Sequence, residues 1–122
     1  HYLHEQQDKI KKVTPKWMIG FSDTTALLVY FENVYGWPVV HGASPKQFFA
    51  KDVDQKTELT TMNLLFGKPS TDIIQLSPLN DFARKESMIE ATLTGGNLSL
   101  IDISIKDLWE IQTKNKIIFF ED

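Results

Sequence analysis

Short apolar runs alternate with helix-forming segments along this 122-residue chain, and this alternation is its most constraining feature. Residues 16–21 form a brief apolar run that predicts a buried strand. Residues 22–25 follow directly, and their hydroxyl and carboxylate groups predict a capped helix N-terminus. The same order of strand and helix recurs further along the chain. Strands that alternate with helices predict an α/β fold.

The other elements are predicted from apolar periodicity and from glycine or proline stops. We expect helices at residues 1–12, 26–35, 47–50, 54–66 and 98–105. The last of these is also compatible with a strand, because its isoleucines alternate. We expect further strands at residues 37–41, 73–76, 88–93 (leading into 95–97) and 116–121, the last one buried. Residues 77–87 are polar and mixed, and they predict a connection between domains.

Composition and charge exclude several classes of protein. The net charge of −3 argues against a nucleic-acid partner, which normally meets a basic patch. The absence of cysteine excludes disulfides, thiolate catalysis and cysteine-ligated zinc. No apolar run approaches the roughly 20 residues that span a bilayer, so we expect no membrane partner. The histidines and acids show no ligand spacing, so we expect no metal.

The strand, the sequence Gly20-Phe21-Ser22-Asp23-Thr24 and the helix follow the order of a nucleophile elbow. A serine on such a turn projects from the sheet edge at a helix N-terminus, where N–H groups and the helix dipole favour negative charge. The N–H of Asp23 is then placed to stabilise an oxyanion. The usual pattern has glycine where this chain has Thr24. A simpler alternative, in which Ser22 only caps the helix, stays open at this point.

Four blocks of sequence, in order, resemble the LD-carboxypeptidase family of serine peptidases, which includes the microcin C immunity peptidases. W-M-I-G-F-S-D-T-T-A-L at residues 17–27 resembles the family block IGYSDITAL, and V-H-G at residues 40–42 resembles a strand ending in HG. L-T-G-G-N-L-S-L at residues 93–100 resembles GGNLSL, and K-I-I-F-F-E-D at residues 116–122 resembles ILFLED. The resemblance extends over about residues 14–122.

The resemblance implies a catalytic triad in the order serine, glutamate, histidine. Ser22 matches the nucleophile and Glu121 the acid, while the histidine and a glycine-rich oxyanion loop fall outside these residues. It also implies a partial Rossmann/flavodoxin-like nucleophile domain within residues 1–79. Residues 80–122 would then be a linker and the start of a smaller C-terminal α/β domain. On this basis the chain is expected to be an internal piece of a longer protein.

The function implied by the resemblance is cleavage of the LD-peptide bond before the terminal D-alanine of murein tetrapeptides. We therefore expect a cytoplasmic hydrolase of peptidoglycan recycling, with a muropeptide substrate and no cofactor. A homodimer is an open option. Two alternatives remain: a peptidase that cleaves microcin C-type peptidyl-nucleotides, and a non-catalytic relative. We expect these 122 residues alone to be inactive, because the base is missing.

Several other residues are weaker candidates. His41 is a possible base, but a histidine after an apolar strand is more often structural, so we expect it to line the site. Gly96 and Asn97 are expected either to line the substrate site or to form a tight turn in which Asn97 caps the next helix. Arg84, the single arginine, is a candidate for the substrate carboxylate or a solvated side chain. Asp102 is either buried and paired or exposed.

Overall fold

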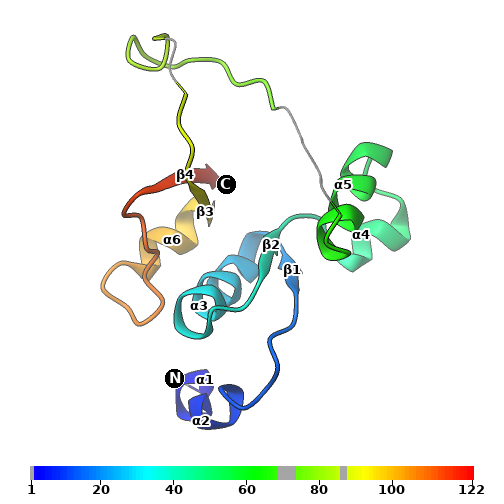
Figure 1. Cartoon of the computed structure of the whole chain (residues 1–122), viewed down its shortest axis with the longest axis vertical. Helices are drawn as coiled ribbons and strands as arrows, with labels where there is room; N and C mark the ends of the chain where they lie inside the picture. Colours follow the sequence, from blue (N-terminus) through cyan, green and yellow to red (C-terminus); the bar gives the residue numbers. More distant parts are fainter. Residues whose placement is uncertain (1, 69–73, 86–87) are drawn as a thin grey trace.

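The structure is a computed structural model that describes residues 2–68, 74–85 and 88–122. Its centre is helix α3, Thr25–Tyr35, which contacts two separate parallel sheets (Figure 1). One sheet pairs β1, Met18–Gly20, with β2, Val39–His41. The other pairs β3, Thr92–Asn97, with β4, Lys116–Glu121. Helices and parallel strands alternate along the chain, and the predicted α/β class is confirmed.

The register of each sheet decides which residues meet at its carboxyl edge. Gly20 pairs with His41 at the end of the first sheet, and Asn97 pairs with Glu121 at the end of the second. Strands of a parallel pair run in the same direction, so their carboxyl ends lie side by side. The residues that follow β1 therefore lie at the same edge as the last residues of β2. In the same way, the last residues of β3 and β4 lie at one edge of the second sheet.

The core forms where α3 packs against α6, Leu98–Ser104. Val29 of α3, Ile101 of α6 and Ile111 form a buried cluster, against which Trp109 packs. α3 is the most buried helix because its middle turn is almost wholly apolar: Leu28, Val29, Tyr30 and Phe31 are all buried. The helix ends at Gly36, whose φ of 65° is the left-handed conformation expected of a C-terminal glycine.

The remaining helices lie at the periphery (Figure 1). The predicted N-terminal helix is present as two short pieces, α1, Tyr2–Glu5, and α2, Gln7–Ile10. A second pair follows β2: α4, Pro45–Ala50, and α5, Gln55–Leu65. Asp54 caps α5 by accepting a 2.9 Å hydrogen bond from the N–H of Thr57. The helices predicted at residues 47–50, 54–66 and 98–105 are therefore confirmed.

Two predicted strands are wrong in whole or in part. Residues 74–76 have no strand, and residue 73 of that prediction lies outside the described part of the chain. Residues 88–91 are also irregular, and the strand there begins only at Thr92. Leu76 is 84% and Met88 96% exposed, and none of the described strands pairs with residues 74–76 or 88–91. An apolar run forms a strand only where a partner strand supplies hydrogen bonds.

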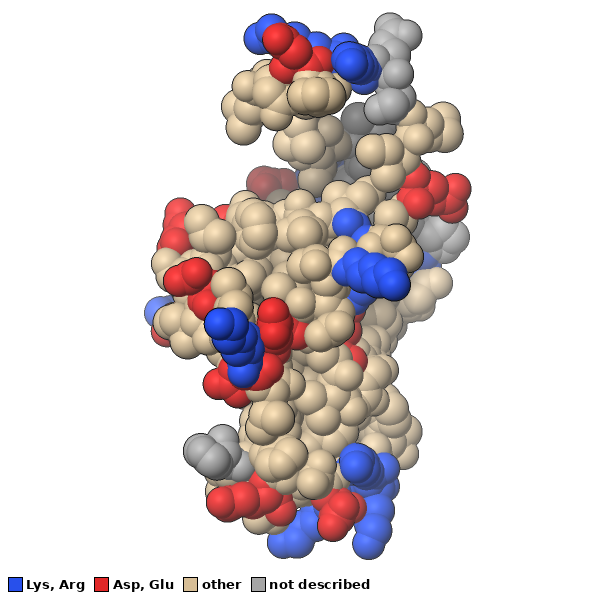
Figure 2. All heavy atoms as spheres, turned by 90° about the vertical axis from the view of Figure 1, so that its left-hand side faces the viewer, with Lys and Arg blue, Asp and Glu red and all other residues tan. Residues whose placement is uncertain are grey.

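The predicted burial of β4 is also wrong in part. The strand has the predicted bounds, but Ile117, Ile118 and Phe120 are 39–54% exposed. β4 has β3 on one side and no further strand among the described residues on the other. The division at residues 79 and 80 stays a prediction. On the face drawn in Figure 2, acidic and basic side chains lie in small mixed groups over an otherwise uncharged surface.

Candidate active site

Ser22 lies on a strained turn between β1 and α3. Its φ is 54°, and it begins a single 3₁₀ turn, η1, Ser22–Thr24, which leads into the helix. A residue with a side chain rarely adopts this left-handed conformation, and it does so mostly where surrounding structure imposes it. A Cβ on Gly20 would lie 2.5 Å from the side chain of Thr24, so the turn closes only because residue 20 is glycine.

The alternative in which Ser22 merely caps the helix finds no support. The capping residues of η1 and α3 are Phe21 and Thr24, and neither makes a side-chain cap hydrogen bond. The predicted capping by side chains of residues 22–25 is therefore wrong, because the turn directs the backbone differently from an ordinary cap. Ser22 is partly exposed and Asp23 is exposed. The N–H groups of a first turn have no partner inside the helix, so the oxyanion role of the Asp23 N–H stays a prediction.

The carboxyl end of β3 is held against the start of α3. The N–H of Asn97 donates a 3.1 Å hydrogen bond to Oγ1 of Thr25, whose side chain is fully buried. A Cβ on Gly96 would lie 2.6 Å from the side chain of Thr25, so the close approach requires glycine there. This contact joins the turn that carries Ser22 to the strand that pairs with β4.

The side chain of Asn97 is occupied by contacts within the protein. Its Oδ1 accepts a 3.2 Å hydrogen bond from the N–H of Leu100, so it caps α6. Its Nδ2 donates to the carboxylate of Asp122 at 3.2 Å, and the Ser99 hydroxyl donates to the same carboxylate. The capping option for Asn97 is confirmed, whereas the lining of a substrate site by Gly96 and Asn97 stays a prediction.

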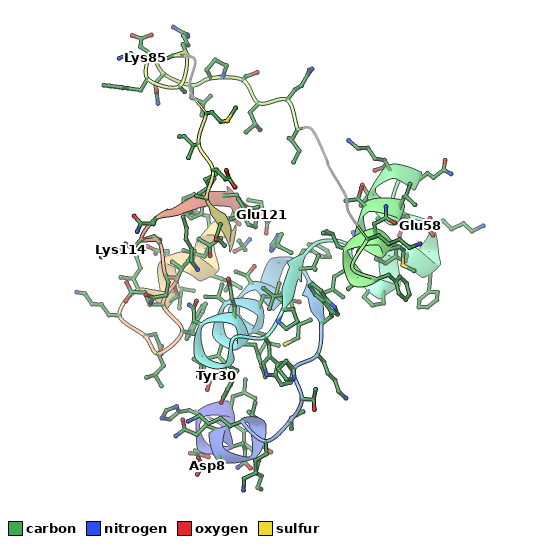
Figure 3. All side chains as sticks on the ribbon, viewed as in Figure 1. Asp8, Tyr30, Glu58, Lys85, Lys114 and Glu121 are labelled. Atoms are coloured by element: carbon green, nitrogen blue, oxygen red, sulfur yellow. The ribbon has the colours of Figure 1, made fainter. Side chains whose placement is uncertain are left out.

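Glu121 and His41 meet between the two sheets. Oε1 of Glu121 lies 3.5 Å from Nε2 of His41, and Figure 3 shows Glu121 at the carboxyl end of β4. The His41 ring also meets the Phe119 ring edge to face, with centroids 5.1 Å apart. Burial lowers the pKa of His41, and the attraction of Glu121 offsets this only in part. The imidazole is therefore neutral near pH 7.

These contacts bring most of the predicted residues to one region. His41 pairs with Gly20, two residues before Ser22, and it contacts Glu121, which pairs with Asn97. Asn97 in turn bonds to Thr25, three residues after Ser22. Sequence reasoning missed the contact between His41 and Glu121. No local pattern could have revealed it, since the two residues lie in different sheets and 80 positions apart.

Two weaker candidates, Arg84 and Asp102, are both exposed. Arg84 forms an exposed 2.9 Å ion pair with Asp81 on the arm between α5 and β3. Asp102 is exposed, which decides between its two predicted environments. Among the described residues, no group of three or more histidine and acidic side chains is arranged to hold a metal. No described helix has both the length and the apolar character needed to cross a bilayer.

Comparison with known proteins points to one family. Residues 2–42 match the family described as the LD-carboxypeptidase N-terminal domain. A putative carboxypeptidase of Rickettsia conorii is 38% identical over 108 residues, and a probable murein peptide carboxypeptidase of Bacillus subtilis is 31% identical over 109. Each match covers 88% of this chain and 34% of the relative. The chain therefore spans about a third of the length of these relatives.

Solved structures of the microcin C7 self immunity protein MccF share the fold. The wild-type apo form superposes with a TM-score of 0.66 at 20% identity, covering 94% of this chain and 42% of that one. A mutant bound to adenosine monophosphate gives a TM-score of 0.67 at 21% identity, with the same coverage. At this identity the likeness concerns the fold alone. The family match and the curated relatives confirm the predicted resemblance to the LD-carboxypeptidase family.

Proposed function

We propose that these residues form the nucleophile and acid part of a serine-type carboxypeptidase. Its reaction would be hydrolysis of the LD-peptide bond before the terminal D-alanine of a murein tetrapeptide. The single observation that carries the proposal is the strained turn at Ser22, whose φ of 54° sets a partly exposed hydroxyl at a helix N-terminus. Strain of this kind in a native structure is concentrated at functional sites.

In the proposed mechanism, Oγ of Ser22 forms a bond to the carbonyl carbon, and a histidine outside these residues takes its proton. That histidine then gives the proton to the leaving amine as the C–N bond breaks and D-alanine departs. Water next attacks the acyl-enzyme with the same histidine as base, which restores Ser22. Glu121 would orient the imidazole and stabilise its charged form, and the Asp23 N–H would bind the oxyanion.

Murein peptides are the favoured substrate class because the Bacillus subtilis relative, at 31% identity, is named as a probable murein peptide carboxypeptidase. A peptide of this kind would be recycled in the cytoplasm, which is the location we propose. The shared fold of MccF supports a second candidate, a peptidyl-nucleotide of the microcin C type. Both substrates require the same nucleophile and differ only in the group that is recognised.

The test is D-alanine release from muramyl tetrapeptide by the full-length protein and its Ser22→Ala variant. We expect the substitution to abolish release while the unfolding free energy stays within about 0.5 kcal/mol of wild type, because a partly exposed hydroxyl contributes little to stability. Phosphonylation of Ser22 by a fluorophosphonate, in which the serine oxygen bonds to phosphorus and fluoride leaves, would identify the nucleophile directly.

The same assay separates the alternatives. Cleavage of a peptidyl-nucleotide but not of the tetrapeptide would favour the microcin-type candidate. A full-length wild-type protein that cleaves neither and resists the fluorophosphonate would be a non-catalytic relative. Undiminished hydrolysis by the Ser22→Ala variant would refute the proposed nucleophile.

A further inference from the structure

We propose that His41 is a positioning residue for the triad acid. Its Nε2–H donates to Oε1 of Glu121 and holds the carboxylate so that Oε2 remains available to orient the catalytic histidine. This inference rests on the proposed function, since it assigns Glu121 the role of triad acid. Both partners of this interaction, His41 and Glu121, lie within the described residues.

The position of the His41 ring places its Nε2 beside the carboxylate of Glu121. Phe119 and Glu121 are two residues apart on β4, so their side chains project from the same face of the strand. The His41 ring contacts both: it meets the Phe119 ring edge to face, and its Nε2 lies 3.5 Å from Oε1 of Glu121. Only 18% of the His41 side chain is exposed, so its orientation is set by packing.

Among the described residues, one carboxylate oxygen at this contact has no hydrogen-bond donor. Oε1 of Glu121 is buried without a hydrogen-bond partner among the described residues, and 3.5 Å is longer than an ordinary hydrogen bond. A buried carboxylate oxygen needs a donor, and Nε2 of His41 lies 3.5 Å from it. Catalytic hydrogen bonds are often long in a substrate-free enzyme and shorten in the complex. A neutral imidazole that carries its proton on Nε2 supplies the donor.

The same contact argues against His41 as the base. A triad imidazole bonds the acid through one nitrogen and the serine hydroxyl through the other. Nδ1 of His41 is buried and has no hydrogen-bond partner among the described residues, so it is not bonded to Ser22. His41 therefore acts on Glu121 rather than on the reacting groups.

The test compares three variants of the full-length enzyme. His41→Gln keeps an N–H donor near the place of Nε2, whereas His41→Met fills the same space against Phe119 without a donor. His4→Gln changes an exposed histidine of α1 in the same way and serves as the matched control. We expect His41→Met to lower kcat roughly tenfold with KM nearly unchanged, since partners that orient a catalytic group act at this scale. His41→Gln should recover most of that loss, and His4→Gln should match wild type.

Two results would overturn the inference while leaving the proposed function intact. Wild-type kcat in His41→Met would mean that the ring only packs against Phe119. A loss in folded His41→Gln as complete as in Ser22→Ala would mean that His41 is itself the base. Failure of the proposed function is recognised separately, by activity that survives Ser22→Ala.

A second measurement does not depend on turnover. Nitrogen-15 NMR of the full-length protein should show His41 neutral at pH 7 with its proton on Nε2, and Glu121→Ala should perturb those resonances. A proton on Nδ1, or resonances unchanged in Glu121→Ala, would overturn the inference even if the natural substrate were another peptide.

Discussion

At the scale of single residues, the site depends on a few positions where backbone and side chain conflict. Ser22 has a side chain where the backbone favours glycine, with a φ of 54°. Gly20, in contrast, has no side chain because Thr24 fills the space where a Cβ would lie. The backbone of the turn is therefore held by its surroundings before any substrate binds.

This strain predicts an order of stability at position 22. Ser22→Gly should be more stable than Ser22→Ala by roughly 1 kcal/mol, because glycine adopts the left-handed conformation without steric cost. Chemical denaturation of the two full-length variants measures the difference. Ser77 is the control, since it lies in an irregular segment and its φ is not positive, so glycine should give no gain there. Equal stabilities at position 22 would contradict the strained turn.

A second prediction at this scale concerns the buried bond between Thr25 and Asn97. Thr25→Val keeps the shape of the side chain but leaves the Asn97 N–H without its acceptor, which should cost about 1–3 kcal/mol of unfolding free energy. Amide hydrogen exchange at Asn97 should accelerate in Thr25→Val. Thr25→Ser retains the hydroxyl and should keep that amide protected, and loss of protection in both variants would argue against this bond.

At the scale of elements, the two sheets meet through the ends of their strands. α3 begins directly after the Ser22 turn, and its first residue binds the end of β3. The end of β4 is bound to the start of α6, because Asp122 accepts hydrogen bonds from Asn97 and Ser99. The end of β3 is thus held by the first residue of α3, and the end of β4 is held by residues at the start of α6.

The link at Asp122 predicts a dependence on pH. Hydrogen bonds from Ser99 and then Asn97 lower the pKa of Asp122 in the folded state. A carboxyl with a lowered folded pKa stabilises the fold above its unfolded pKa, and this contribution is lost as the pH falls through the folded pKa. The unfolding free energy should therefore fall below about pH 4 by an amount that Asp122→Asn does not show. Identical acid dependence of the two proteins, measured by denaturation, would exclude the link.

Local patterns predicted most elements because their causes are local. The helices at residues 25–35 and 55–65 follow from apolar periodicity ended by Gly36 and Gly67, and their observed bounds agree with the predicted ones to within a residue or two. The strand expected at residues 73–76 is absent at residues 74–76 for a non-local reason: none of the described strands pairs with them. The late start of β3 at Thr92 has the same cause, since Thr92 is the first residue that β4 pairs with.

At the scale of the whole molecule, the chain exposes more surface than a compact protein of its mass. Its accessible area is 9742 Å², whereas a compact protein of 14.0 kDa exposes about 6,700 Å². Large apolar side chains lie on the surface, among them Phe49, Leu79 and Met88, each at least 88% exposed. Figure 1 shows one cause, since residues 74–85 lie away from the helices and strands.

This surface predicts a poorly cooperative domain. The isolated 122 residues should unfold in urea over a broad range and bind the dye ANS, whereas the full-length protein should show a sharp transition and little binding. The isolated chain should also release no D-alanine from muramyl tetrapeptide. Measurable activity, or a sharp transition with the slope expected of a 122-residue domain, would show that these residues suffice by themselves.

The sequence by itself determined the α/β class, the positions of most helices and strands, the turn at Ser22 and the resemblance to LD-carboxypeptidases. These follow from short-range causes: apolar periodicity, glycine stops and motifs a few residues long. Only the tertiary structure decided that β1 pairs with β2 and β3 with β4, that Thr25 holds the end of β3, and that His41 contacts Glu121. Those contacts join residues about 20 to 80 positions apart, and they depend on how elements pack together, which no local pattern records.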